Sequence, residues 1–276
     1  MNAILTIARK EFKDGLRNRW VIAITVLLAV FALSLSLLGS APTGATKANP
    51  VEVTVVSLAS LSIFLLPLIA LLLSYDAIVG DVERGTMALL LSYPLARWQV
   101  VLGKYLGQLL ILAVATVVGY GIAALGMALW QKGIGWQWAV WQPYVRFIGS
   151  SVLLGAAFLA MGYLLSALVR ERATAAGLSI GVWLLFVLIY DLLLLGILVA
   201  DKGQHVSAQM LDIALLVSPA DAYRILNLSG GSATLSGMLG MAGQSALQPF
   251  ALLASLAIWT AAPLMLAIFL FQRRNL

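Results

Sequence analysis

The stretch WVIAITVLLAVFALSLSLL, Trp20–Leu38, contains no charged residue over 19 positions. A helix needs about 20 apolar residues to cross roughly 30 Å of hydrocarbon, so this stretch predicts a membrane-spanning helix. A cleaved signal peptide is the alternative, because Gly39-Ser40-Ala41 follows the apolar run. Apolar cores of signal peptides run about 7–15 residues. The run here is longer and follows a long basic segment, which favours a retained first span.

The rest of the chain repeats this pattern. The sequence is 62% hydrophobic and 10% charged, whereas soluble domains carry about 25% charged residues. Strands of a membrane barrel would alternate in polarity over about 10 residues, and the apolar runs here do not alternate. We therefore expect an all-α polytopic membrane protein, residues 1–276, forming a single domain. Its six spans are predicted near residues 20–40, 54–75, 105–129, 147–169, 178–200 and 250–271.

The basic residues predict the orientation. Of the 17 Lys and Arg, 12 lie in residues 1–19, 76–104 and 170–177 and in the C-terminal tail. The positive-inside rule assigns these segments to the cytoplasm, with both termini inside, in a bacterial inner membrane. The remaining cations lie in the segments predicted to face outward: Lys47, Lys132, Arg146, Lys202 and Arg224. The net charge of +6 thus fits membrane topology and does not indicate a nucleic-acid partner.

Residues 1–19 form an amphipathic pattern of their own. On a helix, one arc would carry apolar side chains and the opposite arc cations: Ile4, Leu5, Ile7, Ala8, Phe12 and Leu16 against Arg9, Lys10, Lys13 and Arg17. Such a helix suits the cytoplasmic membrane interface, with its cations at anionic headgroups. A simple extension of the first span is the alternative.

The segment DVERGTMALLLSYPLARWQVVLGK, Asp81–Lys104, lies between the second and third predicted spans. Its apolar run Met87–Leu91 predicts a short helix, and Pro94 ends that helix because the residue before a proline avoids the α conformation. A short helix with charged ends is suited to docking a cytoplasmic partner. The alternative is an ordinary loop whose charges face water.

This segment resembles the first coupling region of the type-2 ABC permease family, which contacts the ATPase. The resemblance is carried by an acidic start, a Gly-Thr pair, a leucine run, Ser-x-Pro, and Arg followed by Gly-Lys. Residues 170–177 resemble the second coupling region, and Ser218–Arg224 resembles a periplasmic family motif, with Ser where Asn is usual. The implied ATPase-contact residues are Asp81, Glu83, Arg84, Gly85, Thr86, Pro94, Arg97, Gly103, Lys104, Arg170, Glu171 and Arg172. The implied periplasmic residues are Pro219, Asp221, Tyr223 and Arg224.

The resemblance also implies partners. It implies a homodimer of permeases in lipid with two cytoplasmic ABC ATPase subunits, which bind the ATP and Mg²⁺. Within the family, the sequence most resembles the permeases of the system that matures nitrous oxide reductase, which implies a periplasmic accessory protein that acts in assembling the copper centres of that enzyme. The chain itself is expected to be non-catalytic and without a cofactor. Residues 80–86 have the two-glycine spacing of a phosphate loop but lack its lysine.

Asp191 lies inside the fifth predicted span. An ionisable residue at that depth is costly unless it is paired or hydrated, so it is a functional candidate. It could line a transport path, pair with Arg146, or sit at the interface if the span ends early. A proton-coupled carrier built around Asp191 is therefore the alternative function. The sequence shows no convincing internal repeat of the kind that such carriers often have.

Two further features remain open. The pairs Gly103/Gly107 and Gly177/Gly181 allow close helix contact and are weak indications of a dimer face. Residues 201–249 are expected to be periplasmic or re-entrant, with a helix around Met210–Leu216. His205, Met238 and Met241 have side chains that suit Cu(I). Because methionine commonly fills apolar packing, we expect no metal site there.

Overall fold

The computed structural model describes residues 3–17, 19–38, 50–130, 137–201, 208–228 and 247–274. Every regular element in these residues is a helix, which confirms the all-α prediction. The helices are α1 (Ala3–Leu16), α2 (Arg19–Leu38), α3 (Pro50–Ser74), α4 (Val79–Glu83), α5 (Thr86–Leu91), α6 (Arg97–Trp130), α7 (Trp138–Leu168), α8 (Arg172–Leu184), the π-helical turn η1 (Leu185–Ile189), α9 (Tyr190–Asp201), α10 (Ala208–Val217), α11 (Pro219–Leu228) and α13 (Pro249–Arg273).

Five helical segments of the described chain are long and apolar enough to cross a membrane. They are Val51–Glu83, Arg97–Leu129, Trp138–Leu168, Arg172–Ala200 and Pro249–Arg273. The pair α1–α2, bent by 67°, makes a sixth if it is counted as one span. All six predicted ranges overlap these segments. α6 and α7 are longer than predicted, because they begin before their apolar runs, α6 with Arg97 and α7 with Trp138.

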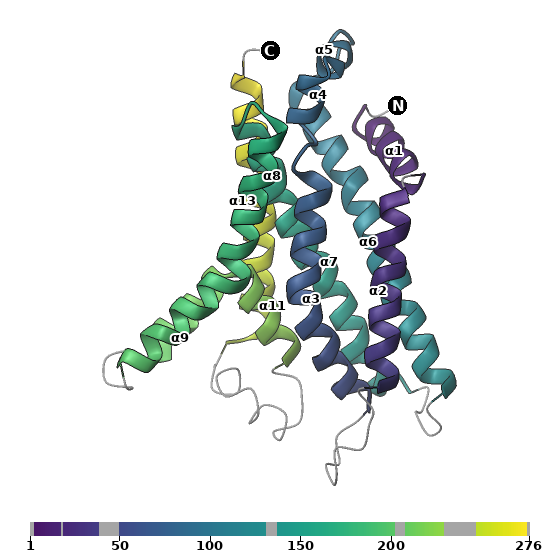
Figure 1. Cartoon of the computed structure of the whole chain (residues 1–276), viewed down its shortest axis with the longest axis vertical. Helices are drawn as coiled ribbons and strands as arrows, with labels where there is room; N and C mark the ends of the chain where they lie inside the picture. Colours follow the sequence, from purple (N-terminus) through teal and green to yellow (C-terminus); the bar gives the residue numbers. More distant parts are fainter. Residues whose placement is uncertain are drawn as a thin grey trace.

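α7 forms the centre of the bundle. It packs against α3 on one side and α13 on another, and most of its length from Tyr144 to Ala167 is buried. α1 and α2 pack instead against α6 (Figure 1). Gly103 and Gly107 make the α1 contact possible, because a Cβ atom on Gly107 would lie 2.8 Å from the carbonyl oxygen of Ala8. These two glycines therefore face α1 of the same chain. The interpretation of this pair as a dimer face, made from the sequence, is corrected.

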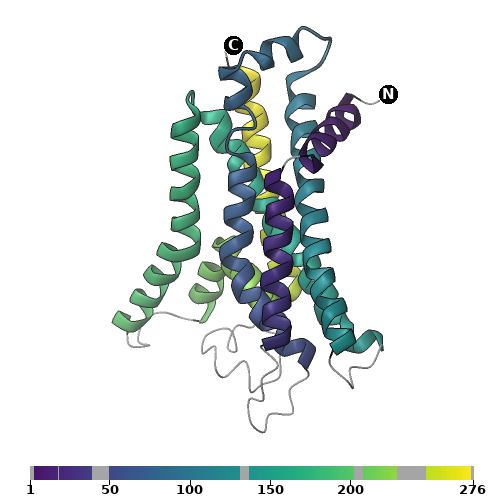
Figure 2. The same cartoon turned by 45° about the vertical axis from the view of Figure 1, so that its right-hand side comes forward.

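The fifth span is the least enclosed part of the bundle. In its most apolar stretch 6% of residues are buried, against 72% in the corresponding stretch of α7. Its distal half, α9, leans away from the other helices (Figures 1 and 2). No atom would lie within 4 Å of a Cβ added at Gly177 or Gly181, so this face of α8 is open.

Both termini lie at the same end of the bundle, together with α1, α4 and α5, whereas α9 and α11 lie at the opposite end (Figure 1). We call these the terminal end and the distal end. The predicted coupling regions thus share one end, and the fifth span connects it to the distal end.

Candidate functional site

The turn between α4 and α5 is rigidly built. Gly85 has φ +71°, in the left-handed region that favours glycine, and it lets the chain reverse directly after α4. Ser166 of α7 accepts hydrogen bonds from the backbone N–H groups of Ile78 and Val79, both at 3.0 Å. These bonds satisfy donors at the start of α4, which have no partner within the helix. The hydroxyl of Thr86 donates to the carbonyl of Asp81 at 3.1 Å, which fixes α5 against α4.

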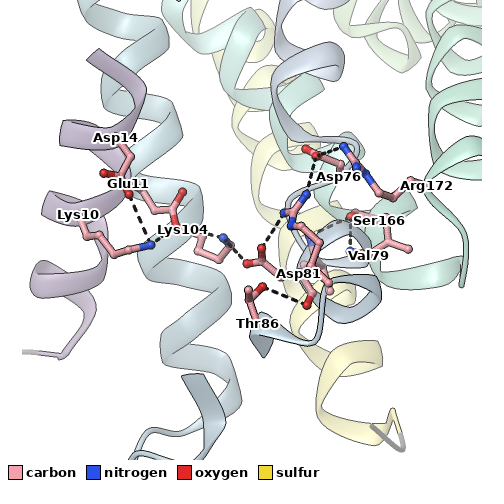
Figure 3. Close-up of polar contacts among 12 residues, drawn as sticks. Lys10, Glu11, Asp14, Asp76, Val79, Asp81, Thr86, Lys104, Ser166 and Arg172 are labelled. Atoms are coloured by element: carbon pink, nitrogen blue, oxygen red, sulfur yellow. Dashed lines mark hydrogen bonds and ion pairs between the residues drawn. The ribbon is translucent and has the colours of Figure 1, made fainter. Parts of the chain in front are cut away.

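Six side chains at the terminal end form what we call the charge network: Glu11, Asp76, Asp81, Arg84, Lys104 and Arg172. At its centre, Lys104 of α6 joins Glu11 of α1 to Asp81 of α4, with distances of 3.1 and 2.8 Å from its Nζ atom (Figure 3). The side chain of Lys104 is only 8% exposed. A cation this deeply buried is stable only with close counter-charges, and here two carboxylates supply them.

The network continues to α8. Asp76 accepts a hydrogen bond from Arg172 at 2.9 Å and lies 3.8 Å from Arg84. Glu83 accepts a hydrogen bond of 2.8 Å from the backbone N–H of Arg172. A carboxylate at this position both caps the first turn of α8 and interacts favourably with the positive end of the helix dipole. Both predicted coupling regions are therefore held together by side chains of the same chain.

A cavity of about 350 Å³ opens beside the network. Its wall comes from α1, the α4–α5 segment and α6, and includes Glu11, Asp76, Asp81 and Lys104. Gln108 also lines it, and the Oε1 atom of Gln108 is buried without a hydrogen-bond partner among the described residues. The terminal end thus combines fixed charge pairs with a cavity lined by charged and polar side chains.

Arg97 has an internal contact that the sequence did not reveal. Its Nη1 atom donates to three carbonyl oxygens at the end of α13, those of Phe271, Gln272 and Arg274, at 3.3, 3.1 and 2.6 Å. The last carbonyls of a helix lack partners within the helix and carry partial negative charge, so a guanidinium stabilises them. Arg97 therefore joins the first coupling region to the C-terminal helix.

A second group of charges, which we call the distal triad, consists of Asp191, Asp221 and Arg224. The guanidinium of Arg224 contacts Asp191 at 2.5 Å and Asp221 at 2.8 Å. Of the alternatives left open for Asp191, the structure shows a pairing, but with Arg224 and not with Arg146, because α11 packs against η1 and brings Arg224 to Asp191. Arg146 instead lines a small cavity together with Glu52 and Asn227.

The local structure of α11 explains how Arg224 is placed. Ser218 accepts a hydrogen bond from the backbone N–H of Asp221 at 3.2 Å, and Pro219 is the first residue of the helix. This is the arrangement typical of a helix start, with a serine cap followed by proline at the first helical position. Tyr223 is buried and shares a 2.8 Å hydrogen bond with Ser151 of α7, which fixes α11 against the centre of the bundle.

Comparison with known proteins identifies the family. Residues 5–276 match the family described as "ABC-2 family transporter protein". The chain belongs to the ABC-2 transporter family. It is 48% identical over 276 residues to the probable ABC transporter permease protein NosY of Stutzerimonas stutzeri, with 99% of both chains covered. The probable ABC transporter permease protein NosY of Pseudomonas aeruginosa shows the same identity and coverage.

Within this ABC-2 chain, the residues predicted to contact an ATPase separate into two groups. Glu83, Arg84, Gly85, Thr86, Pro94, Arg170 and Glu171 are exposed at the terminal end. Asp81, Arg97, Gly103, Lys104 and Arg172 are buried or half-buried. The buried group has contacts within the chain, so it holds the exposed group in position.

Sequence reasoning missed Glu11, Asp76 and Ser166 in this ABC-2 chain. The chain has only 11 acidic residues, so each acid near a predicted coupling region was a signal that could have been used. Ser166 gave no signal, because its role depends on α7 packing beside α4.

His205, Met238 and Met241 lie outside the described residues. α10 confirms the helix expected around Met210–Leu216.

Proposed function

We propose that this chain is the permease subunit of an ABC transporter whose ATP hydrolysis occurs on a separate subunit. The terminal end faces the cytoplasm, in agreement with its share of the basic residues. α1 is the interfacial helix there, and α4–α5 with the start of α8 docks the ATPase. ATP and Mg²⁺ belong to that partner. The assembly contains two permease chains and two ATPase subunits.

One observation carries this proposal: the charge network joins α1, α4, α6 and α8 in one connected set of contacts below an exposed short helix. α5 presents Leu89 at 69% exposure and the turn after it presents Tyr93 at 66%, while Met87 on α5 is buried at 1%. Large apolar side chains next to charged residues are typical of a protein contact. A force applied to α5 would pass through Asp81 and Lys104 to α6, and through Glu83 to α8.

The fifth span is suited to carry this movement across the membrane. Arg172 and Asp76 hold it at the terminal end, and Arg224 holds Asp191 in its distal half. Between them, the indole N–H of Trp183 donates to the carbonyl of Phe64 on α3 at 3.0 Å. In the most apolar stretch of this span only 6% of residues are buried, so we infer that a displacement at Arg172 moves α9.

Because the chain is similar to NosY, we propose that the movement driven by ATP hydrolysis serves copper-site maturation of nitrous oxide reductase. The movement either exports a substrate or acts mechanically on a periplasmic accessory protein at the distal end. A strain that carries only a docking-deficient permease should then make nitrous oxide reductase with a reduced copper content.

The docking proposal is tested with Leu89→Asp. An aspartate on the exposed face of α5 should prevent co-purification of the ATPase and abolish ATPase stimulation, while membrane insertion stays normal. Leu129→Asp is the matched control, because Leu129 is a leucine of 81% exposure near the distal end of α6. If Leu89→Asp retained the ATPase at the wild-type ratio with full stimulation, α5 would not be the docking element.

A further inference from the structure

The distal triad has an imbalance of charge. It contains two carboxylates, Asp191 and Asp221, and a single guanidinium, Arg224, which contacts both. With both acids ionised, the net charge of the triad is −1. Such a charge is strongly disfavoured in an apolar environment, because little water is present to solvate it.

Asp221 is the member of the triad that is least able to carry this charge. Its side chain is 1% exposed, whereas those of Asp191 and Arg224 are each 29% exposed. One of its oxygens, Oδ1, accepts a hydrogen bond from Arg224. The other, Oδ2, is buried and has no hydrogen-bond partner among the described residues. An ionised carboxylate oxygen that is buried without a donor is unfavourable.

Within the part of the chain that the structure describes, the helices around α11 provide no second cation to the triad. α3 contributes Glu52, α7 contributes Arg146 and α10 contributes Asp212. In the described residues no ion pair joins Arg146 to either acid, and Tyr190 beside Asp191 donates its hydroxyl to the carbonyl of Ala214. On α13 the charged residue is Arg273, at the terminal end.

We propose that the distal triad binds one proton, which is held on the carboxyl group of Asp221. The proton comes from water, forms an O–H bond on Asp221, and changes the net charge of the triad from −1 to zero. Arg224 then pairs with the one carboxylate that remains.

The electrostatic surroundings agree with this assignment. Burial raises the pKa of the Asp221 carboxyl to about 7, Arg224 opposes the shift, and the neighbouring Asp191 adds to it. The proton would therefore be bound or released near neutral pH. The triad joins α9 to α11. Release of the proton would therefore weaken the attachment of α9, the distal half of the fifth span. This inference goes beyond the proposed function, and its test needs no ATPase.

The proton can be observed directly by infrared difference spectroscopy. The purified full-length chain in lipid nanodiscs should show the carbonyl band of one protonated carboxylic acid, which disappears as the pH rises through about 7. Asp221→Asn should remove this band. Asp212→Asn is the matched control, because Asp212 lies on the adjacent helix α10 outside the triad, and it should leave the band unchanged.

Two more variants test the proposal without removing Asp221. Asp191→Asn leaves one acid and one guanidinium, a neutral pair, so the midpoint of the band should move to lower pH although Asp221 is present. Arg224→Gln leaves two acids without a cation, so the midpoint should move upward by about one pH unit or more, a tenfold change in proton affinity.

The proposal is overturned if the wild-type chain shows no such band. It is also overturned if Asp191→Asn leaves the band and its midpoint unchanged, or if Arg224→Gln moves the midpoint downward. These outcomes leave the docking proposal intact, because neither the variants nor the readout involves α5 or the ATPase.

Discussion

The charge network and the distal triad are both built from acids and basic side chains, but their charges are balanced differently. The network has three acids and three cations, and its most buried member, Lys104, contacts two carboxylates. The triad reverses this arrangement, with one guanidinium between two carboxylates. The network is neutral through its own side chains, whereas the triad has one more carboxylate than cations among the residues that the structure describes.

This difference indicates that the charge network and the distal triad have different mechanical roles. A neutral network of fixed charges stays assembled over a wide pH range, which suits an element that transmits force from a partner. A triad whose neutrality depends on a proton can be strengthened or loosened near pH 7. The fifth span contacts both regions, through Arg172 and Asp191, so its two ends are held by contacts of different character.

The strongest test of the network is Lys104→Met. Removing this cation leaves the carboxylates of Glu11 and Asp81 facing each other near the membrane, and breaking a buried pair in this way costs about 3–5 kcal/mol. Unfolding of the purified chain should show this loss. Lys10→Met is the control: Lys10 is 69% exposed, and its pairs at the surface contribute less than about 1 kcal/mol. Equal stability of the two variants would show that the network is not held by buried charge.

The corresponding test of the triad is Arg224→Met. We expect a smaller loss, about 2 kcal/mol, because Arg224 and Asp191 are each 29% exposed and water screens part of the interaction. The loss should grow as the pH rises, because both acids then tend to ionise without a cation between them. Measuring unfolding at several pH values checks this, and a loss that is independent of pH would contradict it.

Asp221 predicts a pH dependence that the network does not share. Its pKa is raised by burial to about 7 in the folded chain, above the ordinary value of 3.8. The folded state therefore keeps a proton that the unfolded chain has released, so the free energy of unfolding falls as the pH rises from about 4 to about 7. We expect a fall of at least about 1 kcal/mol, since one pKa unit corresponds to about 1.4 kcal/mol. Asp221→Asn should remove this slope. If the slope survives in that variant, another group causes it.

Arg97→Ala should give the smallest effect, about 1 kcal/mol or less. Arg97 stabilises the carbonyls at the end of α13, and helix-end interactions of this kind contribute on the order of 0.3–1 kcal/mol. Hydrogen exchange should become faster in the last turn of α13. Arg273→Ala is the control, because Arg273 lies 4.1 Å from the ring of Phe269 and leaves the Arg97 contacts in place. Unchanged exchange in Arg97→Ala would show that these contacts do not hold the helix end.

Much of the fold could be predicted because lipid imposes simple requirements. A run such as Trp20–Leu38 can only be helical in hydrocarbon, where each backbone group needs a partner within its own segment. The start of α11 at Ser218-Pro219 was also predictable, because capping depends on neighbouring residues in the chain. The ends of α6 and α7 were less predictable, since helices continue past their apolar residues.

The sites were only partly predictable. Asp191 and Arg224 were each identified separately, Asp191 from its depth in an apolar run and Arg224 from a motif. Their contact joins residues 33 positions apart in the sequence and depends on how α11 packs against η1. The same holds for Glu11 and Lys104, which are 93 positions apart.

By itself, the sequence determined the all-helical membrane fold, the positions of the spans and the family, because these follow from local composition and order. Only the tertiary structure decided that Gly103 and Gly107 receive α1, that Arg97 holds the end of α13, and that Arg224 lies between two acids. The physical reason is that the energy of a charge depends on its neighbours and its burial. Both are set by helix packing and not by position along the chain.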